Sequence, residues 1–174
     1  MSKQSLLGTI VFCLALALTA CAGVEMYFSS PEVQRVSNDY FTAELEPQLQ
    51  PGQDFFTTFR FALTNKTKKE LNIDWENSYY LLNGRRNGRF LWEGVTWDGF
   101  KEIKNKPLIP VAPGDTFTSV IFPKNLVGRV SAMNKGGVQY TQGALPEGEN
   151  GILLFVRQNG RVIRQRMVVN IKLD

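Results

Sequence analysis

Residues 147–173 carry the pattern that most restricts what this chain can fold into. An apolar run at 152–156 and alternating apolar residues over 163–173 flank the dipeptide Asn159-Gly160. Successive side chains of a strand point to opposite faces of a sheet, and Asn-Gly tolerates the positive φ angles of a tight hairpin turn. The segment therefore predicts two antiparallel strands joined by a two-residue turn.

The preceding residues repeat this pattern. Side chains alternate with a period of two over 55–64, and a second alternating run over 71–81 places Trp75 on the inward face. Turn residues at Asn83-Gly84 and Asn87-Gly88 predict a chain reversal and a return strand through 90–97. No convincing helical period follows the N-terminal segment, so the sequence predicts an all-β fold.

The stretch from about residue 40 to residue 174 resembles immunoglobulin-like domains. The resemblance rests on the alternating strand that carries Trp75 and on the terminal hairpin. It implies an antiparallel β-sandwich, although the cysteine pair that braces many immunoglobulin domains is missing. Residues 123–150 fit this pattern least, because they are rich in Gly, Asn and Pro. We expect either a functional loop or an element without a clear sequence pattern there.

The N-terminus has the order of a signal peptide. Lys3 gives a positive start, residues 6–18 form an apolar stretch, and small residues precede Cys21. A permanent span needs roughly 20 apolar residues, and this run is shorter and is interrupted by Gly8 and Thr9. We therefore expect a cleaved leader.

Residues Leu18-Thr19-Ala20-Cys21 resemble the lipobox of bacterial lipoproteins. The resemblance implies that residues 1–20 are removed and that Cys21 becomes a lipidated N-terminus, which attaches the protein to the membrane. Ala22 in place of an Asp favours the outer membrane, facing the periplasm. We expect residues 21–39 to be a tether and residues 40–174 to be the folded domain.

Composition excludes several kinds of chemistry. The chain has no His, and its only Cys residues are Cys13 and Cys21, so the body has no histidine or thiol nucleophile and no His or Cys metal ligand. Carboxylate and lysine chemistry stay open. The net charge of +4 and the expected envelope location favour anionic headgroups or phosphorylated glycans over nucleic acid as acidic neighbours. We predict no metal and no cofactor.

Three groups of side chains are candidates for a site. Asp74 and Glu76 could form a carboxylate pair for glycoside hydrolysis or calcium, but their spacing also fits solvent-facing charges on a strand. Aromatic residues that include Trp92 and Trp97 could stack on sugars or fill the core. Arg85, Arg86 and Arg89 gather at the predicted turn, and further arginines (157, 161, 164 and 166) surround the last hairpin.

Arginine forks suit phosphate and carboxylate partners, but exposed turns also need charge for solubility. We therefore interpret the chain as a non-catalytic envelope lipoprotein that binds or braces an envelope protein or glycan. The possible partner-binding residues are Arg85, Arg86, Arg89, Trp92 and Trp97. The alternatives are a glycan-binding module that uses the aromatic hairpin and, more distantly, a carboxylate-dependent hydrolase.

Overall fold

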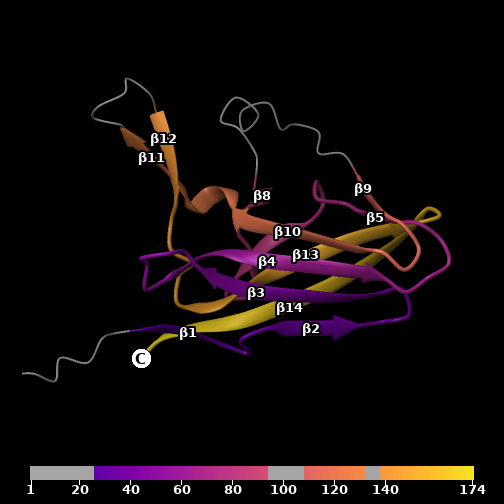
Figure 1. The fold of residues 1–174 in the computed structure, drawn as a ribbon, viewed down its shortest axis with the longest axis horizontal. Helices are drawn as coiled ribbons and strands as arrows, with labels where there is room; N and C mark the ends of the chain where they lie inside the picture. Colours follow the sequence, from indigo (N-terminus) through magenta and orange to yellow (C-terminus); the bar gives the residue numbers. More distant parts are fainter. Residues whose placement is uncertain (1–25, 94–107, 132–137) are drawn as a thin grey trace, which may run out of the picture.

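Two long paired strands, β13 (Gly148–Gln158) and β14 (Arg161–Leu173), form the centre of the structure. The computed structural model describes residues 26–93, 108–131 and 138–174 (Figure 1). The turn between β13 and β14 is formed by Asn159 and Gly160 with φ angles of 49° and 78°, which confirms the predicted hairpin. Asn-Gly adopts both positive φ angles with little strain.

The described strands form two larger antiparallel sheets and one small one. Sheet 1 has the order β1-β14-β13-β5-β9, with β6 also paired to β13 and β7 paired to β6. Its other strands are β1 (Tyr27–Ser30), β5 (Leu71–Ile73), β6 (Tyr79–Leu82), β7 (Arg85–Arg86) and β9 (Ile109–Val111). Sheet 2 consists of β2 (Gln34–Ser37), β3 (Phe41–Leu49), β4 (Phe56–Asn65), β10 (Thr116–Pro123) and β8 (Phe90–Trp92).

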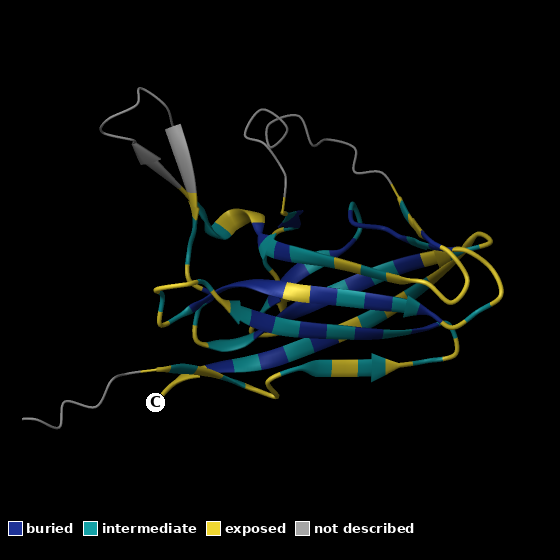
Figure 2. Ribbon diagram, in the orientation of Figure 1, coloured by how far each residue is buried: buried dark blue, intermediate teal, exposed yellow. Residues whose placement is uncertain are grey.

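Sheets 1 and 2 pack face to face as a β-sandwich, as the all-β prediction required. Buried and less buried side chains alternate along β3 and along the second half of β14 (Figure 2). The core draws side chains from both sheets, among them Phe41, Phe59, Phe61, Leu71, Ile73, Trp75, Tyr80, Phe90, Ile152, Leu154, Val156, Met167 and Ile171. Trp75 is 1% exposed, which confirms its predicted inward position.

The folded body begins earlier than the sequence suggested. Residues 21–39 were expected to be a tether, but β1 pairs with β14 and β2 pairs with β3 within this range. The interpretation as a tether is therefore wrong for residues 27–37. A strand of four residues has too few alternating positions to be recognised in a sequence. Here β1 and β2 are held in extended conformation by pairing with longer strands.

Residues 123–150 contain a missed element. A 3₁₀ turn, η1 (Lys124–Leu126), leads into β11 (Val127–Ser131), which pairs with β12 (Val138–Gln142) as a two-stranded sheet. This hairpin stands away from the sandwich (Figure 1). Its base is held by the Gly143 amide, which donates to the Leu126 carbonyl at 2.8 Å, and by the Leu145 amide, which donates to the Phe56 carbonyl at 2.7 Å.

The region after Trp75 departs from the predicted register. A single alternating strand was expected over 71–81, but β5 ends at Ile73 and a turn follows before β6. Both strands pair with β13, β5 at its far end and β6 near its start. The intervening turn shifts the alternation by one residue, so Tyr80 is buried and Tyr79 faces outward, opposite to the prediction.

Strand β8 also lies elsewhere than expected. The reversal at Asn83-Gly84 is present, with φ angles of 48° and 76°. The return strand does not complete a hairpin with β6, however, because β8 pairs with β10 in sheet 2. The chain thus crosses from one sheet to the other after Arg86.

Candidate arginine–aromatic face

The outer face of sheet 1 gathers aromatic and arginine side chains from four strands, β6, β7, β13 and β14. Ile152, Leu154 and Val156 of β13 point into the core, so Leu153 and Phe155 point outward. The register places Leu153 between Tyr79 of β6 and Arg166 of β14, and Phe155 opposite Arg164. Arg86 of β7 lies opposite Leu81, one strand further out.

Guanidinium groups stack on two of these rings. The Cζ atoms of Arg86 and Arg89 lie 4.5 Å and 5.3 Å from the centroid of the Tyr79 ring. The Arg164 Cζ lies 5.4 Å from the Phe155 centroid, and the two rings meet edge to face at 6.5 Å. We call Tyr79, Arg86, Arg89, Phe155 and Arg164 the arginine–aromatic face. A ring stacked under a guanidinium group fixes the plane of that group. The N–H groups at the edge of the guanidinium stay available to an anion.

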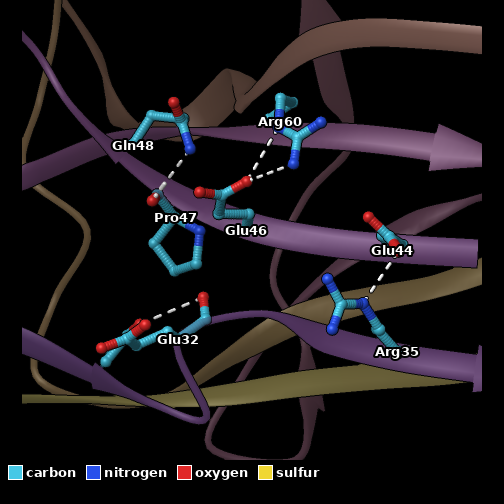
Figure 3. A network of polar contacts seen from close by, with 8 residues as sticks. Glu32, Arg35, Glu44, Glu46, Pro47, Gln48 and Arg60 are labelled. Carbon is cyan, nitrogen blue, oxygen red and sulfur yellow. Dashed lines mark hydrogen bonds and ion pairs between the residues drawn. The ribbon is translucent and has the colours of Figure 1, made fainter.

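The arginines of this face differ from those on the other side of the sandwich. On the outer face of sheet 2, Arg35 pairs with Glu44 at 2.8 Å and Arg60 pairs with Glu46 at 2.6 Å (Figure 3). On sheet 1, Arg166 pairs with Glu149 and Arg157 pairs with Asp74. Within the described ranges, no carboxylate lies within ion-pair distance of the face arginines, which are Arg86, Arg89 and Arg164. Among the described residues, these three arginines of the outer face of sheet 1 are therefore positive charges without a carboxylate partner.

The turn that carries Arg86 is attached to β13 by Asn83. The Asn83 amide donates to the Glu149 carbonyl at 2.8 Å, and the Asn83 side-chain oxygen accepts from the Glu149 amide at 2.9 Å. The Asn87 amide also donates a hydrogen bond of 2.8 Å to the Tyr80 carbonyl. These contacts fix the β6–β7 turn against β13 and β7 beside β6, so backbone pairing holds Arg86 in place.

A buried carboxylate supports the opposite end of the face. Asp74 is 2% exposed, and its Oδ2 accepts from Arg157 Nε at 2.6 Å and from Asn77 Nδ2 at 2.9 Å. Its Oδ1 accepts from the Asn77 amide at 3.0 Å. Burial alone raises the pKa of Asp74, but the hydrogen bonds from Asn77 and Arg157 outweigh burial and hold the pKa below its usual value. The expected solvent-facing position of Asp74 is therefore wrong.

Asp74→Asn is expected to lower the free energy of unfolding by about 2 kcal/mol near neutral pH, because it removes a charged acceptor from three donors. The value is below that of a fully buried pair, since the Arg157 side chain is 45% exposed. The stabilisation by Asp74 is complete above its usual pKa of 3.8 and is lost as the pH falls through the lower folded-state pKa. In urea titrations the gap between wild type and variant should close on acidification, whereas Glu76→Gln should stay close to wild type throughout.

The structure brings together only part of the predicted partner-binding set. Arg86 and Arg89 meet at Tyr79 as described, whereas Arg85 is exposed, lies opposite Leu82 and has no ring contact among the described residues. Trp92 is half-buried, belongs to sheet 2 and packs against the core. Trp97 and Cys21 lie outside the described residues.

Phe155 and Arg164 complete the face but were not predicted as one site with the turn. Their positions follow from the pairing of β6 with β13, which joins residues far apart in the sequence. In the described part of the chain, no three acidic, His or Cys side chains form a group that could hold a metal ion. No described helix is long and apolar enough to cross a bilayer. No family model, curated protein or solved structure matches the chain.

Proposed function

We propose that this chain is a lipid-anchored envelope protein whose arginine–aromatic face binds the phosphates of anionic phospholipid headgroups, without catalysis. The observation that carries the proposal is the set of three arginines stacked on Tyr79 and Phe155 with no carboxylate partner among the described residues. Guanidinium groups bind phosphate oxygens in a forked geometry, and their hydration is weaker than that of lysine.

The position of the expected anchor supports the bilayer as the partner. Four residues lie between Cys21 and Met26, and the five extended steps from Cys21 to Met26 reach at most about 18 Å. The folded body begins at β1, an edge strand of sheet 1 that pairs directly with β14. The tether thus leaves from the sheet that carries Arg164, and it is too short to hold this sheet far from the membrane.

A further side chain adds apolar contact on the same face. Phe28 is 41% exposed and lies opposite Lys172, whose neighbour Ile171 is buried in the core. Alternation therefore places Phe28 and Lys172 on the outer face of sheet 1. Aromatic residues next to basic ones are typical of surfaces that lie at the headgroup level.

The immunoglobulin-like class and the lipoprotein assignment are both parts of this proposal, and the organisation of the sheets supports the first of them. Two antiparallel sheets enclose a buried Trp75 between them, and the long β13–β14 hairpin ends the chain.

Incorporation of labelled fatty acid into the full chain, and its loss in Cys21→Ser, checks the anchor. Equal labelling of the variant would contradict it.

Removal of the face charges tests the binding role. In a fragment of residues 26–174, which contains all described strands, the triple substitution Arg86, Arg89 and Arg164→Gln should weaken binding to phosphatidylglycerol vesicles tenfold to about a hundredfold. Each basic residue near an anionic surface contributes about 1 kcal/mol, less where rings already contact it. Cosedimentation at low and physiological salt measures the change.

The matched control removes three positive charges elsewhere, by Arg35, Lys68 and Lys69→Gln. It should keep most of the vesicle binding. Equal losses in both triple variants would mean that net charge alone drives the association, and no difference between phosphatidylglycerol and phosphatidylcholine vesicles would contradict the proposed role.

A further inference from the structure

A second concave site lies at the end of the sandwich, away from the arginine–aromatic face. It is a cavity of about 380 Å³ where the β3–β4 turn, the end of β8 and the base of the β11–β12 hairpin meet. Its lining consists of polar side chains, namely Gln50, Gln53, Thr57, Glu93, Thr141 and Gln142. Such a volume lies in the lower part of the range of small-ligand sites.

Backbone contacts fix the three elements that form this cavity. The turn Gln50–Gln53 is closed by the Gln53 amide, which donates to the Gln50 carbonyl at 3.0 Å, and Gly52 has a positive φ of 79°. The Glu93 amide donates to the Val120 carbonyl at 2.9 Å. A side-chain bond of 3.1 Å from Gln50 Nε2 to Gln142 Oε1 joins the turn to the hairpin. The arrangement therefore exists without a ligand.

Two lining side chains have unsatisfied oxygen atoms. Thr57 is 1% exposed, and neither its Oγ1 nor the buried Gln53 Oε1 has a hydrogen-bond partner in the described part of the chain. A buried polar atom without a partner is costly, and native proteins retain few of them without a reason. Both residues line the cavity, so a change of side-chain rotamer at Thr57 and at Gln53 would present these oxygens to a ligand.

The donor set defines the chemistry of the ligand. Three amides and two hydroxyls both donate and accept hydrogen bonds, and the Glu93 carboxylate accepts them. Among the described residues, the lining contains no Lys or Arg to balance an anion and no apolar side chain to bind a hydrophobic group. Adjacent hydroxyl groups of a sugar ring match such a set, because each donates one bond and accepts others.

We propose that this cavity binds a neutral carbohydrate of one or two rings, with Thr57, Gln53 and Glu93 as hydrogen-bond partners of its hydroxyl groups. This site differs from the predicted aromatic glycan platform, since the described residue Trp92 does not line it. It is also independent of the arginine–aromatic face, which uses charge and lies on sheet 1.

The test uses the full chain in a zwitterionic detergent without sugar headgroups. Saturation-transfer NMR and calorimetric titration are run with neutral disaccharides (maltose, cellobiose and chitobiose), with glucuronic acid, and with soluble cell-wall glycan fragments. We expect at least one neutral sugar to bind and glucuronic acid to bind at least fivefold more weakly. Comparison of the disaccharides with the cell-wall glycan fragments shows whether the bound ligand is a free sugar or the end of a polymer. Absence of binding by every neutral sugar overturns the proposal.

Two variants connect the binding to this cavity. Thr57→Val and Glu93→Gln should each weaken sugar binding about fivefold or more, as loss of one good hydrogen bond does. Thr57→Val should leave the melting temperature unchanged or raise it, because the hydroxyl has no partner within the described protein. Thr118→Val, on the exposed outer face of sheet 2, should leave sugar affinity unchanged.

Equal sugar affinity in wild type, Thr57→Val and Glu93→Gln would place the binding elsewhere and overturn the assignment. The triple substitution of the face arginines should not alter sugar binding. The two proposals can therefore fail separately.

Discussion

Trp75→Ala is expected to lower the free energy of unfolding by about 3 to 5 kcal/mol, the largest effect of any single core substitution in this chain. The indole lies between the sheets with 1% exposure and contacts three rings of sheet 2. Its ring centroid is 5.3 Å from that of Phe61, 6.3 Å from Phe90 and 6.5 Å from Phe117. Alanine leaves a cavity next to these rings. The strands of sheet 2 that carry the rings are held by backbone pairing, so they cannot move in to fill it.

Urea denaturation midpoints measure this loss, and Trp75→Phe is the matched control. The Trp75 Nε1 is buried without a hydrogen-bond partner in the described structure, so phenylalanine removes an unsatisfied donor while it keeps a ring in the same place. We expect a cost of about 1 kcal/mol for Trp75→Phe. A loss below about 1 kcal/mol for Trp75→Ala would show that the indole does not fill the core.

Gly151→Ala should lower stability by about 3 to 4 kcal/mol through overpacking between the two longest strands. A Cβ atom on Gly151 would lie 2.1 Å from the Met167 carbonyl oxygen and 2.8 Å from the Val168 Cα. Both are backbone atoms of β14, so no side-chain rotation relieves the contact. The strands must separate where β6, β13 and β14 join.

Gly128→Ala is the control for this prediction, because the nearest atom to its added Cβ is a Thr141 methyl at the ordinary distance of 3.6 Å. It should change the denaturation midpoint little. If Gly151→Ala unfolds at the same urea concentration as wild type, the close approach of β13 and β14 at this residue is wrong.

The parts of the fold that could be predicted from the sequence are those with local causes. The Asn159-Gly160 and Asn83-Gly84 turns follow from residues that tolerate positive φ, and both are present. The period of two gives the core face of β4 from Phe59 to Leu63, although Phe56, Thr57 and Thr58 are all buried, and Trp75 was correctly placed inside. In these cases the side-chain pattern and the backbone preference point to the same structure.

The errors arise where distant contacts decide the local conformation. Asp74 and Ser78 form a turn whose bonds reach β13, since the Asp74 amide donates to the Phe155 carbonyl and the Phe155 amide donates to the Ser78 hydroxyl. This turn interrupts the expected strand and exchanges the roles of Tyr79 and Tyr80. Asp74, Asn77 and Ser78 are residue types typical of turns and bond to one another, but the contacts to β13 that fix this turn have no signal within residues 71–81.

The candidate site was also predicted only where its signal is local in the sequence. The sequence marked the arginines of the turn and those of the last hairpin as two groups, each typical of an exposed turn. The pairing of β6 with β13 makes them neighbours, and Tyr79 and Phe155 lie between them. Cross-strand neighbours of this kind have no signal in sequence spacing, whereas the composition that excluded histidine and thiol chemistry does not depend on the fold.

The central claim is that the outer face of sheet 1 contacts the membrane, and spin-label accessibility tests it most directly. The fragment of residues 26–174 contains no cysteine, so single labels can be placed at Val162, which is 40% exposed opposite Arg157 on this face, and at Thr118 on the outer face of sheet 2. On addition of phosphatidylglycerol vesicles, the label at residue 162 should become less accessible to a water-soluble nickel chelate and more accessible to oxygen. The label at residue 118 should not change. A response at residue 118, or none at residue 162 while the protein is bound, would contradict the account.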